Sequence, residues 1–200
     1  HKPIAGLKKL QTLQLFSNRL TSNPRGSFSG LTRLTHLYLQ SNLLDAIDFA
    51  SAFHGLNSLK TLELSLNHIR TVISSSSKTD CLFPELRTLY MNGNQLSSLG
   101  PQTFACMPNL TELNLSENRI RSVHPHAFRG LSQLTYLFLT KNEIASLHPD
   151  TLAGLEENLR YLYLVENSTL VSIHPSTFKG FSPDKLFVYK NFDEPMKWTT

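Results

Sequence analysis

Few side chains in this 200-residue chain have types and spacings that could support chemistry at a site. Three histidines each precede a proline: His124, His148 and His174. They could form a pH sensor on stacked segments, but no acidic partner is evident, so a turn preference shared by the three segments is the simpler interpretation. His126 lies beside His124, and these two would supply only two ligands to a metal ion. We therefore expect no metal and no cofactor.

No residue pattern favours catalysis. Residues 26–30 superficially resemble a nucleophile elbow, but the central residue is Phe28 and not a serine. The sequence has no phosphate-cradling glycine loop, no Cys-x-x-Cys pair and no zinc-protease helix motif. We expect a binding protein and not an enzyme.

The charge and hydropathy of the chain argue against some classes of partner. The net charge is +4, and lysine and arginine are scattered among aspartate and glutamate without a run of like charges. This distribution indicates neither nucleic-acid binding nor a polybasic membrane segment. No apolar run approaches the roughly 20 residues that span a bilayer, and the opening HKPIAGLKKL has no signal-peptide pattern. We expect a membrane attachment only through segments outside this chain.

The elements that must position the polar and aromatic side chains follow from a repeating pattern, which is clearest in residues 110–131. Leu113 and Leu115 alternate with polar residues, which predicts a strand with one buried face. Asn118 follows where the chain turns, and its amide can donate and accept hydrogen bonds to backbone groups that the turn leaves unpaired. Phe128 is predicted to fill the outer side of the coil. One such coil cannot bury its own apolar edges, so the coils must stack.

The same pattern recurs along nearly the whole chain. The seven starting leucines are Leu10, Leu34, Leu59, Leu86, Leu110, Leu134 and Leu159. Eight residues after each start stands an asparagine, and these residues are predicted to form a hydrogen-bonded ladder: Asn18, Asn42, Asn67, Asn94, Asn118, Asn142 and Asn167. The outer phenylalanines are predicted to form a core spine: Phe28, Phe53, Phe104, Phe128 and Phe178.

We expect residues 1–200 to form a single array of coils. Residues 1–9 match the tail of one repeat, seven full repeats run from Leu10, and an imperfect eighth repeat is predicted to start at Pro183. The repeat from Leu59 inserts a polar loop at residues 73–80. Neither end carries a cysteine cluster that could cap the array, and uncapped ends would expose apolar edges. The chain is therefore expected to be a piece of a longer receptor or one whose caps come from elsewhere.

The motif FxGLxxLxxLxLxxN, present in residues 128–142, is that of the leucine-rich repeat, and the chain resembles this family over almost all of its length. The resemblance implies an α/β repeat solenoid, a horseshoe with a parallel concave β-sheet and a mostly irregular convex side. The irregular repeat lengths, the insertion at residues 74–77 and a cysteine pair between coils are most similar to a Toll-like receptor ectodomain. That similarity implies a ligand-binding ectodomain segment of an innate immune pattern-recognition receptor.

The resemblance to Toll-like receptors also implies partners and a location. It implies a protein or microbial ligand, a receptor homodimer that the ligand induces, and an extracellular or cell-surface position, with the endosomal lumen as a second compartment. The insertion is much shorter than the processed loop of endosomal members, which argues against the nucleic-acid-sensing branch. Ligands of that family often bind the side of the horseshoe and sometimes the outer face, so the resemblance does not fix which face binds.

Two other interpretations stay open. Matrix proteoglycans and neuronal adhesion receptors share the same coil, and this chain would then be an adhesion or matrix module with a constitutive protein partner. Segments such as residues 23–28 also resemble variable lymphocyte receptors, which bind antigens, although the repeats of those receptors are more uniform than these.

The two cysteines are predicted to lie on the outer side of neighbouring coils. A disulfide between Cys81 and Cys106 would join the long insertion to the next coil, closing a loop of about 25 residues and contributing roughly 3 kcal/mol. The alternative is two free cysteines in the core.

Three N-x-S/T sequons make Asn109, Asn114 and Asn167 candidate glycosylation sites of a secreted glycoprotein. Asn109 precedes a strand and is expected to be accessible. Asn114 is expected to point outward from the concave sheet, where a glycan would block part of that sheet. Asn167 belongs to the predicted ladder and would have to leave the core to be modified.

Outward residues at the second and fourth offsets of each repeat are predicted to form two columns across the sheet. The columns become rich in aromatic residues toward the end of the chain, where Lys185 is expected to follow Tyr161 and Phe187 to follow Tyr163. Aromatic and arginine side chains gathered on an exposed surface are typical of binding hot spots. The alternative is that aromatic residues simply suit exposed strand positions. The candidate ligand-binding residues are Tyr90, Tyr136, Phe138, Arg160, Tyr161, Tyr163, Lys185, Phe187 and Tyr189.

Overall fold

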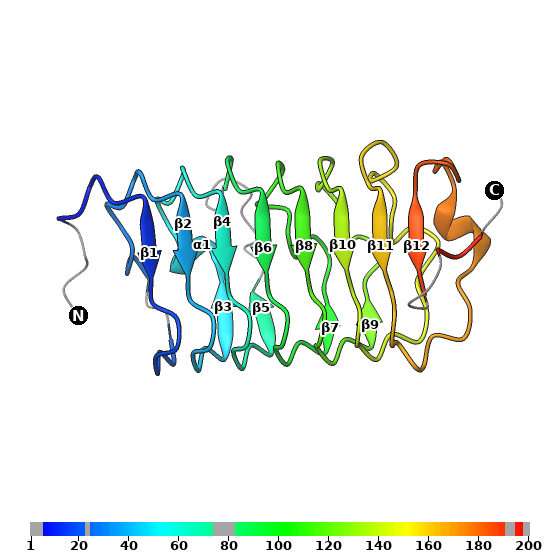
Figure 1. Cartoon of the computed structure of the whole chain (residues 1–200), viewed down its shortest axis with the longest axis horizontal. Helices are drawn as coiled ribbons and strands as arrows, with labels where there is room; N and C mark the ends of the chain where they lie inside the picture. The colour runs from blue at the N-terminus through cyan, green and yellow to red at the C-terminus, as the bar shows by residue number, and fades with distance from the viewer. Residues whose placement is uncertain (1–5, 23–24, 74–82, 191–194, 198–200) are drawn as a thin grey trace.

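A parallel sheet of eight short strands is the main element of the computed structural model, which describes residues 6–22, 25–73, 83–190 and 195–197 (Figure 1). The strands follow the order β1-β2-β4-β6-β8-β10-β11-β12 along the sheet. Their bounds are β1 Thr12–Gln14, β2 His36–Tyr38, β4 Thr61–Glu63, β6 Thr88–Tyr90, β8 Glu112–Asn114, β10 Tyr136–Phe138, β11 Tyr161–Tyr163 and β12 Phe187–Tyr189. Each coil contributes one strand, so the chain winds as a solenoid.

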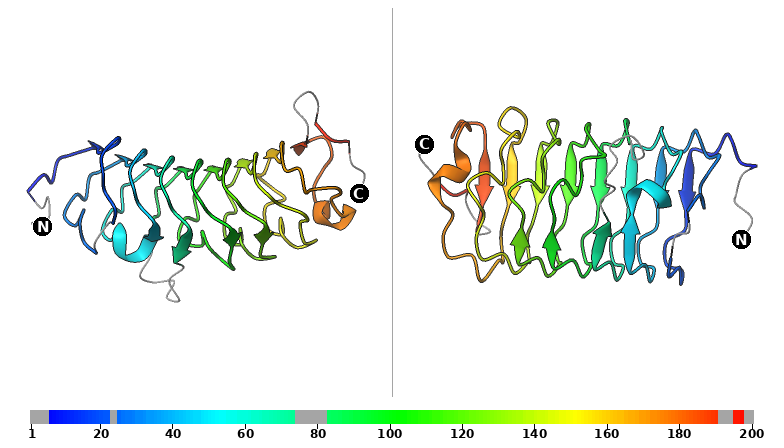
Figure 2. Two further views of the ribbon diagram at one scale, coloured as in Figure 1. Left: turned by 90° about the horizontal axis from the view of Figure 1, so that it is seen from below. Right: turned by 180° about the vertical axis from the view of Figure 1, so that it is seen from behind.

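Neighbouring strands align residues at the same position of the repeat. Leu113 of β8 pairs with Leu89 of β6 and with Leu137 of β10. The central leucine points into the coil and is buried, whereas the residues on either side of it point outward, as the period of two predicts. The predicted solenoid with a parallel concave sheet is therefore confirmed, and the sheet lines one long face of the molecule (Figure 2).

The returning side of the coils carries little regular structure, as the resemblance to leucine-rich repeats implies. Two short parallel pairs form there: β3 (Ala46–Asp48) with β5 (Thr71–Ile73), and β7 (Ser98–Leu99) with β9 (Ser122–Val123). Away from the large sheet lie the single turn α1 (Phe49–Ala52) and the 3-10 turn η1 (Pro175–Phe178) (Figure 2). Of the polar loop predicted at residues 73–80, Ile73 ends β5 and residues 74–80 lie outside the described residues.

The outer phenylalanines form the predicted spine of the core. The rings of Phe28 and Phe53 stack with centroids 6.0 Å apart, and those of Phe104 and Phe128 stack with centroids 6.3 Å apart. All four side chains and that of Phe178 are buried. The spine therefore fills the convex side of the coils, where strands are few.

Six of the seven predicted asparagines form the ladder, whereas Asn18 is exposed and its side-chain nitrogen donates to carbonyls of its own coil. The side-chain nitrogen of Asn118 donates to the carbonyls of Leu115 in its own coil and Met91 in the preceding coil, both at 3.0 Å. Its side-chain oxygen accepts from the N–H of Leu96, also at 3.0 Å. One side chain thus satisfies three backbone groups that a turn inside the core would leave unpaired. The same cross-coil bonds are made by Asn42, Asn67, Asn94, Asn142 and Asn167.

The residue before each of these asparagines has a left-handed backbone. The φ angle lies between 52° and 56° at six non-glycine residues: Ser17, Ser41, Leu66, Glu117, Lys141 and Glu166. The fourth repeat has Gly93 there, with φ 67°. A left-handed conformation costs a residue with a side chain roughly 1–2 kcal/mol. The turn is therefore a property of the coil and not of the local preference of the residue before the asparagine, and it forms even at Ser17, where Asn18 is exposed.

The last coil differs from its predicted register. Phe187 pairs with Tyr161 and Tyr189 pairs with Tyr163, so the prediction that the eighth repeat starts at Pro183 is wrong by two residues. The N–H of Leu186 donates to the carbonyl of Ser182, four residues back. This turn is one residue longer than the usual one and shifts the strand along the chain.

The two edges of the large sheet differ. Beside β12, the N–H of Met196 donates to the carbonyl of Val188 at 2.6 Å, and the Met196 side chain packs against the core. In the first coil, Leu13 is only half-buried, and Leu7 and Phe16 are 51% and 44% exposed. The coil that contains β1 is therefore packed less completely than the central coils.

Candidate ligand-binding surface

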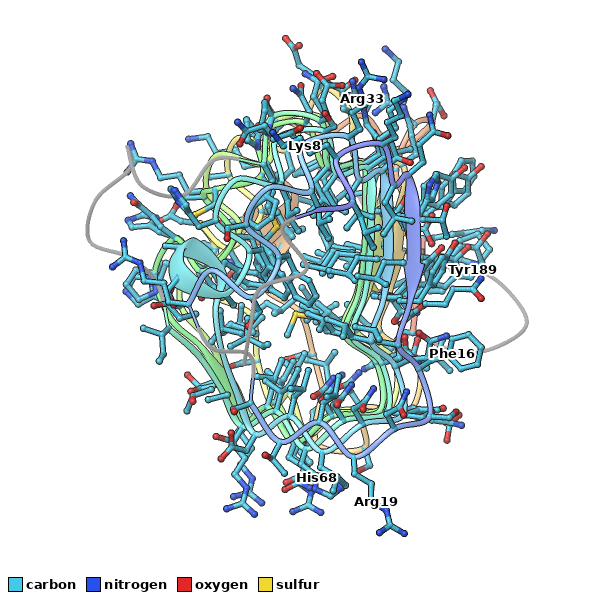
Figure 3. All side chains as sticks on the ribbon, turned by 90° about the vertical axis from the view of Figure 1, so that its left-hand side faces the viewer. Lys8, Phe16, Arg19, Arg33, His68 and Tyr189 are labelled. Atoms are coloured by element: carbon cyan, nitrogen blue, oxygen red, sulfur yellow. The ribbon has the colours of Figure 1, made fainter. Side chains whose placement is uncertain are left out.

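Six aromatic side chains lie together on the concave face at its C-terminal end, and we call them the aromatic plate. They are Tyr136 and Phe138 of β10, Tyr161 and Tyr163 of β11, and Phe187 and Tyr189 of β12. Because the three strands pair in register, side chains at equal positions stand one strand spacing apart. Figure 3 shows Tyr189 projecting from the sheet on the side away from the coil interior.

The rings of the plate stack in two rows along the solenoid. In one row, the ring centroids are 4.9 Å apart from Tyr136 to Tyr161 and 5.5 Å apart from Tyr161 to Phe187. In the other, they are 4.7 Å apart from Phe138 to Tyr163 and 4.8 Å apart from Tyr163 to Tyr189. Aromatic pairs contribute about 0.5–1.5 kcal/mol beyond their buried area. The plate is therefore a preorganised surface and not six independent side chains.

The ring orientation decides what the plate presents to a ligand. The planes of Tyr136 and Tyr161 differ by only 2°, and two coplanar rings would overlap at their centroid separation of 4.9 Å. The rings must therefore meet face to face and stand upright on the sheet. Tyr136 and Phe187 remain 39% and 37% exposed. A ligand would meet mainly ring edges and hydroxyl groups.

Burial raises the pKa of the Tyr163 hydroxyl above its ordinary value, with smaller contributions from Tyr189, Tyr161 and Tyr136. Burial also raises the pKa of Tyr90, and the carboxylate of Glu112 adds to that shift. Tyrosine is protonated at neutral pH even at its ordinary pKa, so these shifts only extend to higher pH the range in which both phenols can donate hydrogen bonds.

Three predicted binding residues lie outside the plate. Tyr90 is two strands away, because Asn114 of β8 stands between Tyr90 and Phe138 in the same column. Arg160 is half-buried, and its guanidinium donates to the carbonyl of Leu159 at 3.0 Å and to the carbonyl of Glu157.

Lys185 is exposed just before β12, and the prediction that it follows Tyr161 in the column is wrong because Phe187 holds that place. Sequence reasoning also missed the return of Met196 to β12, for which the repeat pattern gives no signal.

The three sequons have different surroundings. Asn109 is half-buried, and its side-chain nitrogen donates to the carbonyl of Pro84 at 2.7 Å. Asn114 is half-buried on the concave face, as predicted, and its oxygen accepts from the N–H of Ser116. The nitrogen of Asn167 donates to two carbonyls of the ladder, and a glycan on that nitrogen is incompatible with those bonds.

Cys81 lies outside the described residues, so its disulfide with Cys106 stays a prediction. The N–H of Phe83, two residues after Cys81, donates to the carbonyl of Cys106 at 2.9 Å. Cys106 itself is half-buried and packs against the core.

The three His-Pro segments share a hydrogen bond that explains their recurrence. The Nδ1 atoms of His124, His148 and His174 accept from the backbone N–H two residues later, at 3.1, 3.1 and 3.2 Å. A side chain that accepts in this way closes a local turn. The histidines therefore serve the turns, as the simpler interpretation of the sequence holds. His148 nevertheless has an acidic neighbour that the sequence did not make evident, because Oδ2 of Asp150 lies 3.6 Å from its Nδ1.

Within the described ranges, no three His, Cys, Asp or Glu side chains gather in a group that could hold a metal ion. The helical turns of those same ranges are too short and too polar to cross a membrane.

Comparison with known proteins gives the family of the chain. A family model described as Leucine rich repeat matches residues 2–44, 84–144 and 108–167, together more than half of the chain. Lumican from Homo sapiens is 39% identical over 97 residues, which are 48% of this chain and 26% of lumican. Fibromodulin from Sus scrofa is 35% identical over 97 residues, which are 48% of this chain and 60% of the fibromodulin sequence. The chain thus spans 26% of the length of the human lumican that it matches.

Solved structures share the solenoid. The Toll–Spätzle complex of Drosophila, described as a molecular hub in development and innate immunity, matches with a TM-score of 0.69 and 32% identity, over 82% of this chain and 22% of the matched chain. The TLR13–ssRNA13 complex matches with a TM-score of 0.65 and 23% identity, over 94% of this chain and 33% of the matched chain. The likeness to the TLR13 complex concerns the fold alone.

Proposed function

Because this chain belongs to the leucine-rich repeat family, we propose that it is a ligand-binding ectodomain segment of a Toll-like innate immune receptor and that the aromatic plate is its recognition surface. The arrangement of the aromatic plate is the observation that supports this proposal. Its stacked rings are fixed relative to one another, and Tyr136 and Phe187 at its corners are the most exposed. Rigid aromatic groups on an outward face bind protein partners with little loss of side-chain entropy.

The comparisons favour a protein ligand and a place outside the cell. The matched Toll structure is a complex with Spätzle, and its likeness to this chain covers 82% of the chain. We therefore assign this segment a protein or microbial ligand, a cell-surface location and a role in forming a receptor pair. A role as an enzyme is not proposed, because the plate offers hydroxyl groups and ring edges but no paired nucleophile and base.

A matrix or adhesion protein is the second candidate. Lumican is 39% identical to about half of this chain, which is a higher identity than the 32% of the Toll structure. Lumican and fibromodulin are matrix leucine-rich repeat proteins. A segment of that kind would use the same plate for a constitutive partner of the matrix.

The first experiment removes the rings. In the variant with Tyr136→Ser, Phe138→Ser, Tyr161→Ser and Tyr163→Ser, we expect capture of partner proteins from extracellular fluid and microbial extracts to fall at least tenfold. Tyr38→Ser is the matched control, because Tyr38 occupies the same column of the same face on β2. Thermal unfolding of both variants checks that the solenoid persists. If the variant captures every partner as well as the unaltered protein does, the binding site lies on a lateral or convex face.

Light scattering separates the two candidates. The longer protein that contains this segment is measured alone, with bacterial or viral extracts, and with a captured host protein. A change from monomer to dimer with an extract supports the Toll-like receptor. Stable binding of a host protein without a change of receptor stoichiometry favours the matrix or adhesion module.

A further inference from the structure

The tyrosines of the aromatic plate lie along a diagonal across its three strands, an arrangement that the repeat positions in the sequence do not suggest. The plate is a grid of two columns and three strands, and its two phenylalanines, Phe138 and Phe187, stand at opposite corners. The remaining four positions carry hydroxyl groups and cross the grid from one free corner to the other. We call them the tyrosine band: Tyr136, Tyr161, Tyr163 and Tyr189.

The hydroxyl groups of the tyrosine band are available to a partner. Within the described part of the chain, none of them makes a hydrogen bond to another protein group. Tyr90, on the same face, differs because the carboxylate of Glu112 lies beside its hydroxyl. All four hydroxyl groups are neutral donors at physiological pH, as ordinary tyrosines are.

Upright rings also restrict the chemistry of the partner. The positive edge of an aromatic ring attracts electron-rich groups, whereas its negative face attracts cations and stacks on flat ligands. The faces of Tyr161 and Tyr163 are covered by neighbours on both sides, at centroid distances of 4.7 to 5.5 Å. Nucleobases and sugar rings need an open face for stacking, which these central rings do not offer.

We propose that the tyrosine band binds an extended acidic polypeptide segment of the partner, whose carboxylates accept hydrogen bonds from the four hydroxyl groups. This inference rests on the proposed role of the aromatic plate in recognition. The net charge of +4 and the isoelectric point of about 9.1 favour an acidic partner over a basic one. Arg160 and the exposed Lys185 flank the plate at the edge where the strands begin.

The charge of β8 sets the position of the acidic segment. Glu112 of β8 pairs in register with Tyr136, so a carboxylate stands at that end of the plate. A second carboxylate beside it would be repelled. The acidic segment therefore makes its main contacts with Tyr161, Tyr163 and Tyr189 on β11 and β12, and its hydrogen bond to Tyr136, beside Glu112, is the weakest of the four.

The test removes the hydroxyl groups and keeps the rings, in the variant with Tyr136→Phe, Tyr161→Phe, Tyr163→Phe and Tyr189→Phe. The probes are a fluorescein-labelled peptide of alternating glutamate and glycine, the same peptide with glutamine, and a single-stranded deoxyadenosine oligonucleotide. Fluorescence anisotropy at low salt measures binding to the full chain. We expect the glutamate peptide to bind at least tenfold more tightly than either other probe and to lose at least tenfold in the four-phenylalanine variant.

Tyr38→Phe removes a hydroxyl from the same face outside the plate and is expected to leave peptide binding unchanged. Equal binding of the glutamate and glutamine peptides, tighter binding of the oligonucleotide, or full binding by the four-phenylalanine variant would each overturn the acidic-segment proposal. The role of the plate is judged separately, by the four-serine variant and captured partners. A loss of partner capture in that variant, with no effect of the phenylalanine changes, would retain the recognition surface and reject its acidic ligand.

Discussion

At the scale of single residues, the position before each ladder asparagine shows packing prevailing over local preference. Leucine rarely adopts a positive φ, yet Leu66 has a φ of 52° in the turn before Asn67, whose side chain bonds to Leu64 of its own coil and to Leu39 and Leu44 of the preceding coil. Gly93 holds the same position one coil later, and a Cβ there would lie 2.6 Å from the Cδ2 atom of Leu66. A side chain introduced at position 93 would therefore crowd the side chain of Leu66.

Gly93→Ala is expected to reduce the free energy of unfolding by about 2 kcal/mol, from the left-handed backbone and the crowding against Leu66. With Leu66→Ala already present, the same substitution is expected to cost about 1 kcal/mol less, because only the backbone term remains. Urea unfolding of the four proteins in this cycle measures the difference. An equal cost in both backgrounds would show that Leu66 yields without strain.

At the scale of elements, the asparagine ladder joins strands that make few other directional contacts. Asn118 is buried and bonds to four backbone groups, two of them in the preceding coil, whereas Asn18 is exposed and bonds to the carbonyls of Leu15 and Phe16 in its own coil. The two residues hold equivalent positions of the repeat. Substituting each of them therefore shows how much of the stability that the asparagine contributes comes from hydrogen bonds between coils.

Asn118→Ala is expected to reduce the free energy of unfolding by about 3 kcal/mol or more, because three buried backbone groups lose their partner. Asn18→Ala is expected to cost less than about 1 kcal/mol, since water can replace its bonds. Urea denaturation followed by circular dichroism measures both values. Similar losses at the two positions would mean that the cross-coil bonds contribute little.

The strands were predictable because two signals agree: alternating leucines fix the buried face, and an asparagine eight residues after each start fixes the turn. The register of β12 was not predictable in the same way. The turns before β11 and β12 both hold one residue more than those of the earlier coils, but Leu159 and Asn167 mark the position of β11, whereas neither a leucine nor an asparagine marks that of β12. Lys185 was therefore placed in a column that Phe187 occupies.

The sequence predicted most residues of the candidate site, but it did not predict how their rings are oriented toward a ligand. Offsets in the repeat place Tyr136, Tyr161 and Tyr163 close together, and the structure does the same. The upright stacking of the rings depends on side-chain torsions that strand periodicity leaves free. Consequently, the sequence does not tell whether the plate exposes ring faces or ring edges, and the structure does.

At the scale of the whole molecule, stability should vary along the solenoid, because each coil mainly contacts its neighbours. The core leucines of the central coils are fully buried, whereas Leu13 and Leu15 of the first coil are half-buried. Local opening should therefore begin in the first coil.

Amide hydrogen exchange tests this expectation at equivalent positions of the ladder. The N–H of Leu20 bonds to Asn42, and the N–H of Leu96 bonds to Asn118, both at 3.0 Å. We expect the Leu20 amide to exchange at least tenfold faster, because opening the first coil exposes it. Equal protection of the two amides would indicate that all coils unfold as one unit.

The spacing of the ladder bonds has a consequence for how such a protein changes over generations. Its cross-coil bonds join positions 22 to 30 residues apart, which is the length of one coil. If recombination duplicates or removes one whole coil, every remaining asparagine still has equivalent hydrogen-bond partners. If it removes half a coil, buried backbone carbonyls lose their hydrogen-bond partners. Whole coils are therefore interchangeable units of inheritance. A lineage can rearrange the side chains that its concave face displays while it retains the frame that supports them.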